Sequence, residues 1–167
     1  MKNLLFFFSI CSLFYSCNEY VALPKDRIPL LKNDEVVCYK DSASNMIDTF
    51  RLDVRNIWHQ DTEGGYLQYI EIYYNKSNLK ETLFSIYIGP SGTGGEFSIF
   101  TLQSQSVFSS YTNYFIINGI TYPNVYVIRD NRLAPSDTIP NKVYFTYTNG
   151  IIRYEYTDGR VYELISK

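Results

Sequence analysis

Residues 150–165 read GIIRYEYTDGRVYELI, and this stretch decides the fold class. Apolar and polar side chains alternate on both sides of Asp158-Gly159, a dipeptide typical of tight hairpin turns. If the turn has two residues, Tyr156 lies opposite Val161 and the large apolar side chains share one face. That face then carries Ile152, Tyr154, Tyr156, Val161 and Ile165, and the other carries Arg153, Glu155 and Arg160. Such alternation predicts an antiparallel sheet that covers a core on one side.

The same period of two recurs in earlier segments of the chain. Charged residues alternate with apolar ones in residues 49–59, where the apolar face holds Phe50, Leu52 and Val54. In residues 66–74 the shared face holds Ile70, Ile72 and Tyr74. Both segments therefore predict strands that are buried on one side.

Turn residues and composition complete the expectation for the fold. Asn118-Gly119 predicts a two-residue hairpin, because both of its turn positions require positive φ. Pro123 restricts the following strand locally to an edge or a bulge. Seventeen tyrosines and eleven phenylalanines favour strands over helices. The sequence predicts an all-β fold: a single antiparallel domain of about ten strands, built as a barrel, a half-barrel or a sandwich.

The amino terminus has the features of an export signal. Lys2 supplies a positive charge, residues 4–13 form an apolar run, and Ser16 precedes Cys17. A run of this length is too short to span a bilayer, which takes about 20 helical residues. The pattern predicts a secretory signal over residues 1–16, and the alternative is a buried first strand of the fold.

A serine directly before a cysteine at the end of a signal resembles the lipobox of bacterial lipoproteins, with Phe14 and Tyr15 standing where leucine and a small residue are usual. The short, phenylalanine-rich signal is similar to those of lipoproteins of the Bacteroidetes. Further segments resemble small lipoproteins of the same group, namely residues 41–43, 48–50, 118–125, 144–147, 150–155 and 158–164. The resemblance implies that the signal is removed and that Cys17 carries acyl chains such as palmitate. The alternative is cleavage by an ordinary signal peptidase, which leaves Cys17 as a free thiol.

The expected organisation is a lipoprotein signal peptide at 1–16, a lipid-anchored tether at 17–33 and an antiparallel β domain at 34–167. The tether contains two prolines and no sustained period, so it is expected to be extended and mobile near its start. Two or more acyl chains give stable anchoring, which would place the chain in the cell envelope at the outer membrane. The sequence leaves open which face of that membrane the domain occupies. Glu19 is the only acidic residue among the three that follow Cys17, whereas surface-export signals of these bacteria carry several. This difference slightly favours the periplasmic side.

Charge and cysteine content narrow the classes of partner. Lys2 is the one charged residue of the signal, so the remaining 151 residues carry 14 basic and 17 acidic side chains, a net charge of −3. With no basic run, the sequence predicts no nucleic-acid partner. Cys11 leaves with the signal and Cys17 is acylated, so Cys38 has no partner for an internal disulfide. It lies in an apolar run and is expected to be a small buried hydrophobe.

Three features could carry chemistry, and each has a simpler explanation. His59 is the only histidine, so any nucleophile–histidine pair must use it, but its place at a strand end predicts a solvated side chain. His59, Asp61 and Glu63 could ligate a metal, yet a charged hairpin tip explains them. Residues 89–95 resemble a phosphate loop but lack its Lys-Ser/Thr ending, and a strand follows. The sequence therefore predicts no catalytic residue, no metal site and no cofactor.

Two loop residues are candidates for glycosylation. Asp41-Ser42-Ala43 and Asp137-Thr138-Ile139 resemble the Asp-Ser/Thr-aliphatic triplet used for O-glycosylation in the Bacteroidetes. Ser42 and Thr138 both fall in expected loops, where a glycosyltransferase could reach the hydroxyl.

The function expected from these features is a non-enzymatic structural or binding role of a lipoprotein at the outer membrane. Its partners would be the membrane through the anchor and a glycan or an envelope protein. The alternative is a module that binds a glycan or a lipid in a small barrel, and a hydrolase is the weaker alternative. An interior packed solid with phenylalanine and tyrosine would oppose a lipid carrier, and a lack of exposed coplanar tyrosines would oppose a glycan-binding module.

Overall fold

The computed structural model describes residues 20–60, 64–76, 82–89, 96–101, 104–106, 108–129 and 140–167. These residues form one sheet of twelve strands and a single turn of 3₁₀ helix, η1 (Lys25–Arg27). The strands are β1 (Tyr20–Val21), β2 (Val36–Asp41), β3 (Ile47–Gln60), β4 (Tyr66–Lys76), β5 (Thr82–Gly89), β6 (Glu96–Thr101), β7 (Ser104–Ser106), β8 (Phe108–Ile117), β9 (Ile120–Arg129), β10 (Lys142–Thr146), β11 (Gly150–Glu155) and β12 (Val161–Ser166). The predicted all-β class is confirmed.

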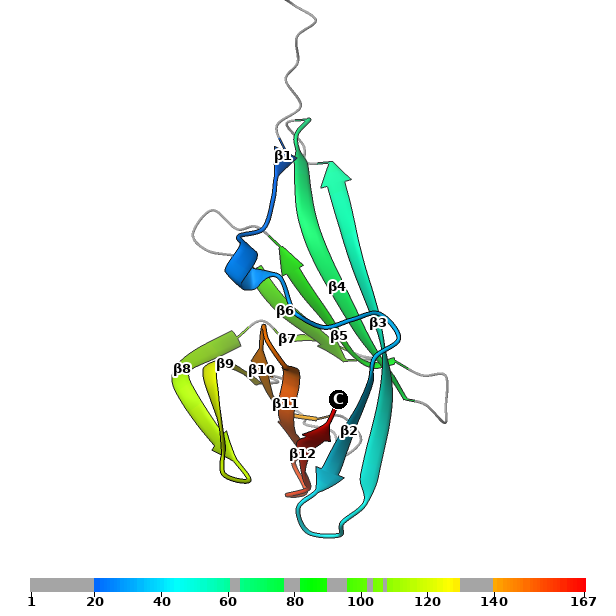
Figure 1. The fold of residues 1–167 in the computed structure, drawn as a ribbon, viewed down its shortest axis with the longest axis vertical. Coiled ribbons are helices and arrows are strands. Elements are labelled where there is room, and N and C mark those ends of the chain that lie inside the picture. Colours follow the sequence, from blue (N-terminus) through cyan, green and yellow to red (C-terminus); the bar gives the residue numbers. More distant parts are fainter. Residues whose placement is uncertain are drawn as a thin grey trace, which may run out of the picture.

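The sheet is curled, and its two edge strands follow each other directly in the chain. The strand order is β7-β6-β5-β4-β3-β2-β12-β11-β10-β9-β8, and β1 is added in parallel to β4. The edge strands β7 and β8 are separated by residue 107 alone, so their facing ends lie at most about 7.6 Å apart. One continuous sheet with its edges drawn together is a half-barrel, as Figure 1 shows, and the sandwich alternative is wrong.

Aromatic rings fill the concave side of the half-barrel. Each of five large rings, from β2, β3, β4, β5 and β11, is at most 1% exposed, namely Tyr39, Phe50, Tyr74, Phe84 and Tyr154. Their ring centroids lie 5.2–6.4 Å apart, mostly edge to face. This is the favoured geometry for aromatic pairs, and the centre of the described sheet is therefore solidly packed.

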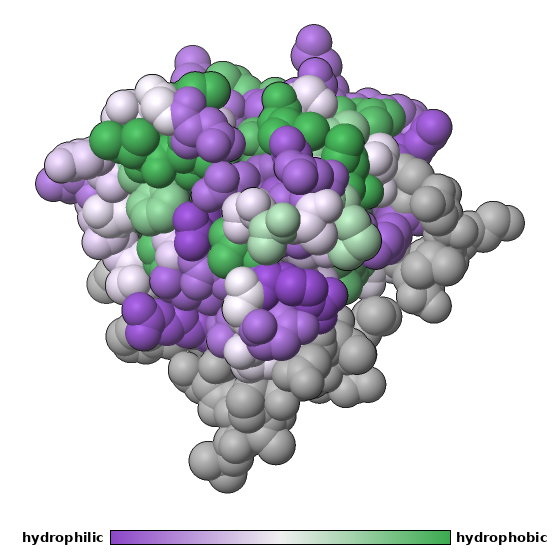
Figure 2. All heavy atoms as spheres, turned by 90° about the horizontal axis from the view of Figure 1, so that it is seen from below, coloured by the Kyte–Doolittle hydropathy of each residue, from purple (hydrophilic) through white to green (hydrophobic). Residues whose placement is uncertain are grey.

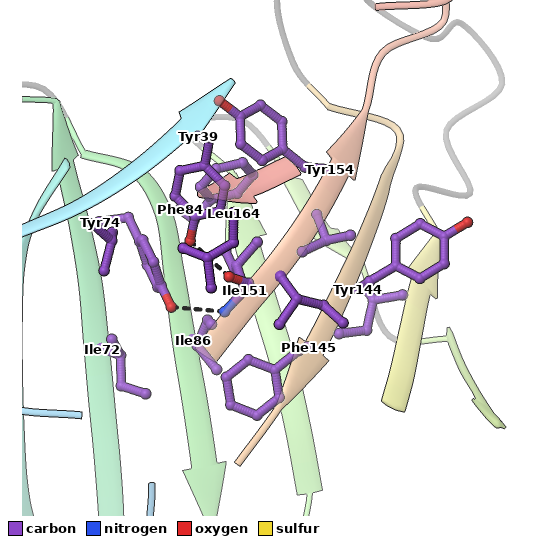
Figure 3. Close-up of a cluster of buried hydrophobic side chains, with 14 of the residues drawn as sticks. Tyr39, Ile72, Tyr74, Phe84, Ile86, Tyr144, Phe145, Ile151, Tyr154 and Leu164 are labelled. Carbon is purple, nitrogen blue, oxygen red and sulfur yellow. Dashed lines mark hydrogen bonds between the residues drawn. The ribbon is translucent and has the colours of Figure 1, made fainter. Parts of the chain in front are cut away.

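Two of these tyrosines hold the backbone of one residue in β11. The pairing of β10 with β11 shifts register between Tyr144 and Phe145, so β11 carries an extra residue at this point. Next to this bulge, the Tyr39 hydroxyl donates to the Ile151 carbonyl at 2.8 Å, and the Ile151 N–H donates to Tyr74 Oη at 2.9 Å. Figure 3 shows both hydroxyls converging on Ile151 across the core. The two tyrosines therefore satisfy buried polar groups that would otherwise be costly.

The hairpin at Asp158-Gly159 differs from the sequence prediction by one residue. The loop has three residues, 157–159: Tyr156 N–H donates to the Arg160 carbonyl at 2.9 Å, and Gly159 takes a φ of +91°. Tyr154 therefore lies opposite Tyr162, not Glu163. Because a slip of one residue reverses the face of every side chain, Tyr162 and Leu164 are buried in place of the predicted Val161 and Ile165. The predicted inward positions of Ile152, Tyr154 and Tyr156 are confirmed.

The hairpin at Asn118-Gly119 is confirmed. Ile117 pairs with Ile120, and the two turn residues have φ of +50° and +79°. Beyond it, β10 pairs with β9 only from Tyr126 to Arg129, so Pro123 lies where β9 has β8 as its one neighbour. The missing proline N–H therefore costs no hydrogen bond to β10, in agreement with the predicted local edge.

Residues 20–33 form an N-terminal arm that crosses the open side of the half-barrel, from β4 towards β10 and back to β2 (Figure 1). Leu23 and Leu31 are buried in the core cluster, and the Leu30 N–H donates to the Tyr147 carbonyl at 3.1 Å. The prediction of a tether up to residue 33 is therefore wrong for its described part, which belongs to the domain. The prolines that indicated a tether, Pro24 and Pro29, instead lie on either side of the 3₁₀ turn of this arm.

Candidate functional site

The predicted lipidation site, Cys17, lies outside the described residues, and the description begins three positions later at Tyr20. Strand β1 pairs with the first residues of β4, with Tyr20 opposite Tyr66 and Val21 opposite Leu67. This pairing places Tyr20 and Val21 at the turn end of the long β3–β4 hairpin, at the top of Figure 1. The first described residues of the chain therefore lie at this end of the sheet.

Three aromatic side chains cluster at this end, and we call Tyr20, Trp58 and Tyr66 the aromatic tip. The Tyr20 ring stacks on Tyr66 with centroids 5.0 Å apart and meets Trp58 edge-on at 5.7 Å. Tyr20 is 63% exposed and Trp58 43%, whereas Tyr66 is half-buried. Strands β3 and β4 remain paired as far as Gln60 and Tyr66, whereas β5 pairs with β4 only as far as Ile70. The aromatic tip therefore projects beyond β5.

A polar layer separates the aromatic tip from the core. Gln68 is buried on β4, where its Oε1 accepts the Leu23 N–H at 2.9 Å and its Nε2 donates to Asn56 Oδ1 at 3.0 Å. Trp58 pairs with Gln68 across β3 and β4, so both side chains lie on the concave face of the sheet. The aromatic tip therefore continues the concave face past the point at which the core ends, and core packing does not account for it.

His59 is exposed on the opposite face of β3 from the aromatic tip. Its ring meets Tyr69 edge-on at 5.2 Å, and Tyr69 in turn covers the backbone of Gly89, where an added Cβ would lie 2.3 Å from the ring. Asp61 and Glu63 lie outside the described residues. Among the residues that are described, no three His, Cys, Asp or Glu side chains come together as metal ligands.

The opposite end of the molecule carries two shallow hollows beside the β8–β9 turn. One, of about 320 Å³, lies between β9 and β12, and the other, of about 330 Å³, between the β2–β3 turn and β12. Ser42, the predicted glycosylation site, is exposed and lines the second hollow together with Asn118 and Glu163. Figure 2 shows this end as hydrophobic patches separated by hydrophilic residues. Thr138, the second predicted glycosylation site, lies outside the described residues.

A network of charges ties β10, β11 and β12 together on the convex face. Arg153 donates to Glu155 at 2.8 Å and to Glu163 at 3.0 Å, and Glu155 also accepts the Tyr144 hydroxyl at 3.0 Å. Burial raises the pKa of Glu155, but the hydrogen bonds from Tyr144 and Arg153 outweigh it and hold the pKa below its usual value. Each charge has a partner of opposite sign, so the network fixes strands and offers no free acid or base.

Cys38 is half-buried, and its Sγ lies 3.7 Å from the Thr49 hydroxyl of the neighbouring strand. It is therefore less enclosed than the sequence indicates. Its nearest polar partner is a neutral hydroxyl, which does not activate a thiol as a cation would.

Comparisons of the chain with known protein families, curated proteins and solved structures gave no match. In the described part of the chain, no helix is both long and apolar enough to span a bilayer.

The aromatic tip is the feature that sequence reasoning missed. Trp58 and Tyr66 flank a predicted turn, and Tyr20 follows Cys17 closely, so each residue was visible in the sequence. What joins them is the parallel pairing of β1 with β4, and no local pattern announces a two-residue strand.

Proposed function

We propose that this chain is a lipoprotein, anchored in the outer membrane of a bacterial envelope by acyl chains on Cys17, with a non-enzymatic structural or binding role. The observation that carries the proposal is the position of Cys17: it directly follows residues 1–16, which have the pattern of an export signal, and stands three residues before the first strand of the fold. Cleavage before Cys17 would leave every described strand intact and put the lipid directly beside the domain.

The packing of the half-barrel supports binding at the surface of the domain and opposes binding of a ligand in its interior. The concave side is filled by ring contacts among Tyr39, Phe50, Tyr74, Phe84 and Tyr154, which leaves no room at the centre of the described sheet for an acyl chain. This opposes the lipid-carrier alternative. The stacked pair at the aromatic tip presents one ring above the other and no coplanar platform, which gives no support to glycan binding.

The arrangement of the two ends supports a binding role away from the membrane. With the anchor beside the aromatic tip, the hollows near Ser42 and Ile120 lie at the opposite end of the long axis (Figures 1 and 2). Exposed apolar side chains gather around these turns, namely Met46, Ile47, Ile116, Ile120 and Ile165. An envelope protein is the partner class that such a surface favours.

Radiolabelled palmitate tests the proposal in cells that produce wild-type or Cys17→Ala protein. We expect label in the wild type, none in Cys17→Ala, and wild-type protein in the outer-membrane fraction. Protease shaving of intact cells then assigns the face of the membrane, with protection expected for a periplasmic domain. Wild-type protein that is exported without label would refute the proposal.

A further inference from the structure

Only residues 18 and 19 separate the proposed anchor, Cys17, from the first described strand. From Cys17 to Tyr20 there are three Cα–Cα steps, which span at most about 11 Å when fully extended. Tyr20 is held in the sheet by its pairing with Tyr66. An acylated Cys17 at the membrane surface therefore keeps this end of the sheet within about 11 Å of the bilayer.

The chemistry at this end matches the interfacial region of a bilayer. Tyr20 is 63% exposed, Trp58 is 43% exposed, and Val21 beside them is 38% exposed. Tryptophan and tyrosine concentrate at membrane–water interfaces, because an apolar ring and a polar N–H or O–H suit the level of the headgroups. The Gln68–Asn56 layer marks the end of the core, so packing in the core does not account for the exposed apolar surface of these rings.

We propose that the aromatic tip lies in the interfacial region of the bilayer that holds the anchor, and so sets the orientation of the half-barrel on the membrane. This inference rests on the proposed acylation of Cys17. The contact is with the phospholipid interface itself and not with anionic headgroups, since the charged residues next to the tip in sequence are Glu19, Asp61 and Glu63. The long axis of Figure 1 would then stand away from the membrane, with the β8–β9 turn at its distal end.

Trp58 is the only tryptophan of the chain and reports on this contact without labelling. The full lipidated protein is purified in detergent and reconstituted into phosphatidylcholine vesicles, with or without bromine on the acyl chains near the headgroup. We expect brominated lipid to quench Trp58 and expect its emission to shift to the blue relative to detergent-free Cys17→Ser protein. High salt should leave the quenching unchanged, because the contact is apolar.

The control moves the reporter to the other end of the molecule. Trp58→Phe/Tyr114→Trp keeps one tryptophan and places it on β8 at a position where the native tyrosine is 61% exposed. Brominated lipid should not quench it. Equal quenching of the two reporters, or no quenching of Trp58, overturns the inference.

Mass spectrometry of the same sample separates this inference from the proposed function. If Cys17 carries acyl chains and Trp58 is not quenched, the orientation is wrong while the anchor stands. If Cys17 is unmodified, the anchor is wrong and the inference falls with it.

Discussion

Removing one buried hydroxyl, in Tyr74→Phe, tests how the core is held together. The ring stays, so its edge-to-face contacts with Phe50 and Phe84 are kept. What is lost is the acceptor of the Ile151 N–H, 2.9 Å away in a core where both residues are at most 1% exposed. A buried donor left without a partner costs about 1–3 kcal/mol. For a domain of this size that corresponds to a fall in Tm of about 2–12 °C.

Urea and thermal unfolding of the purified variants, followed by circular dichroism, measure this loss. Tyr111→Phe is the matched control, because the Tyr111 hydroxyl also donates a hydrogen bond, to Asn124 Oδ1 at 2.6 Å, but on an exposed surface where water replaces it. Its cost should stay within about 0.5 kcal/mol. Equal losses in the two variants would refute the assignment of Tyr74 as the partner of Ile151.

Three further predictions concern the arm, the outer face and pH. Leu31→Ala should cost about 2–5 kcal/mol of unfolding free energy, because the arm buries Leu31 in the core cluster, while Leu30→Ala on the exposed side of the arm should cost less than about 0.5 kcal/mol. Similarly small losses in both variants would mean that the arm is a tether after all. Gly89→Ala should cost about 1–3 kcal/mol in the same unfolding assay, since its Cβ meets the Tyr69 ring, and Tyr69→Ala should recover part of that loss. Burial raises the pKa of Tyr39 and Tyr154 above the value of about 10 that tyrosine has in the unfolded chain. The free energy of unfolding should therefore be unaffected by these groups below pH 10 and should fall above pH 10 by about 1.4 kcal/mol per pH unit for each of them. The phenolate absorbance of the buried tyrosines should then appear together with unfolding, as a step beyond that of exposed tyrosines such as Tyr20 and Tyr114. Gradual titration of every tyrosine in the folded state would contradict this.

Much of the sheet follows from local pattern. The alternation of Phe50, Leu52 and Val54 fixes which face is buried, because a strand has a period of two and the charged residues between them must stay in water. Asn118-Gly119 fixes its turn, because both residues adopt positive φ readily and the flanking pair is then determined.

Asp158-Gly159 shows where the same kind of signal is ambiguous. A two-residue turn and a three-residue loop that ends in a bulge both place glycine at positive φ. The structure has the second, with positive φ at Gly159 and not at Asp158. Sequence alone therefore left the register open by one residue, and the burial of Tyr162 in place of Val161 is the consequence.

Long-range contacts set the features that no local pattern predicts. Leu23 and Leu31 lie in a segment without periodicity. They are core residues because the arm crosses the open side of the half-barrel and buries them there, which only the three-dimensional structure shows. The curling of the sheet depends on β7 and β8 being opposite edges of one order, which neither strand reveals separately. In the same way, Cys17 was a candidate from its sequence position, whereas the aromatic tip needed the pairing of β1 with β4.

The most direct test of the central claim is the mass of the amino-terminal peptide of the protein recovered from its own envelope. The account predicts a chain that starts at Cys17 and carries the added mass of acyl chains on that residue. A chain released in water-soluble form with an unmodified Cys17 thiol, or one that still retains residues 1–16, would contradict it.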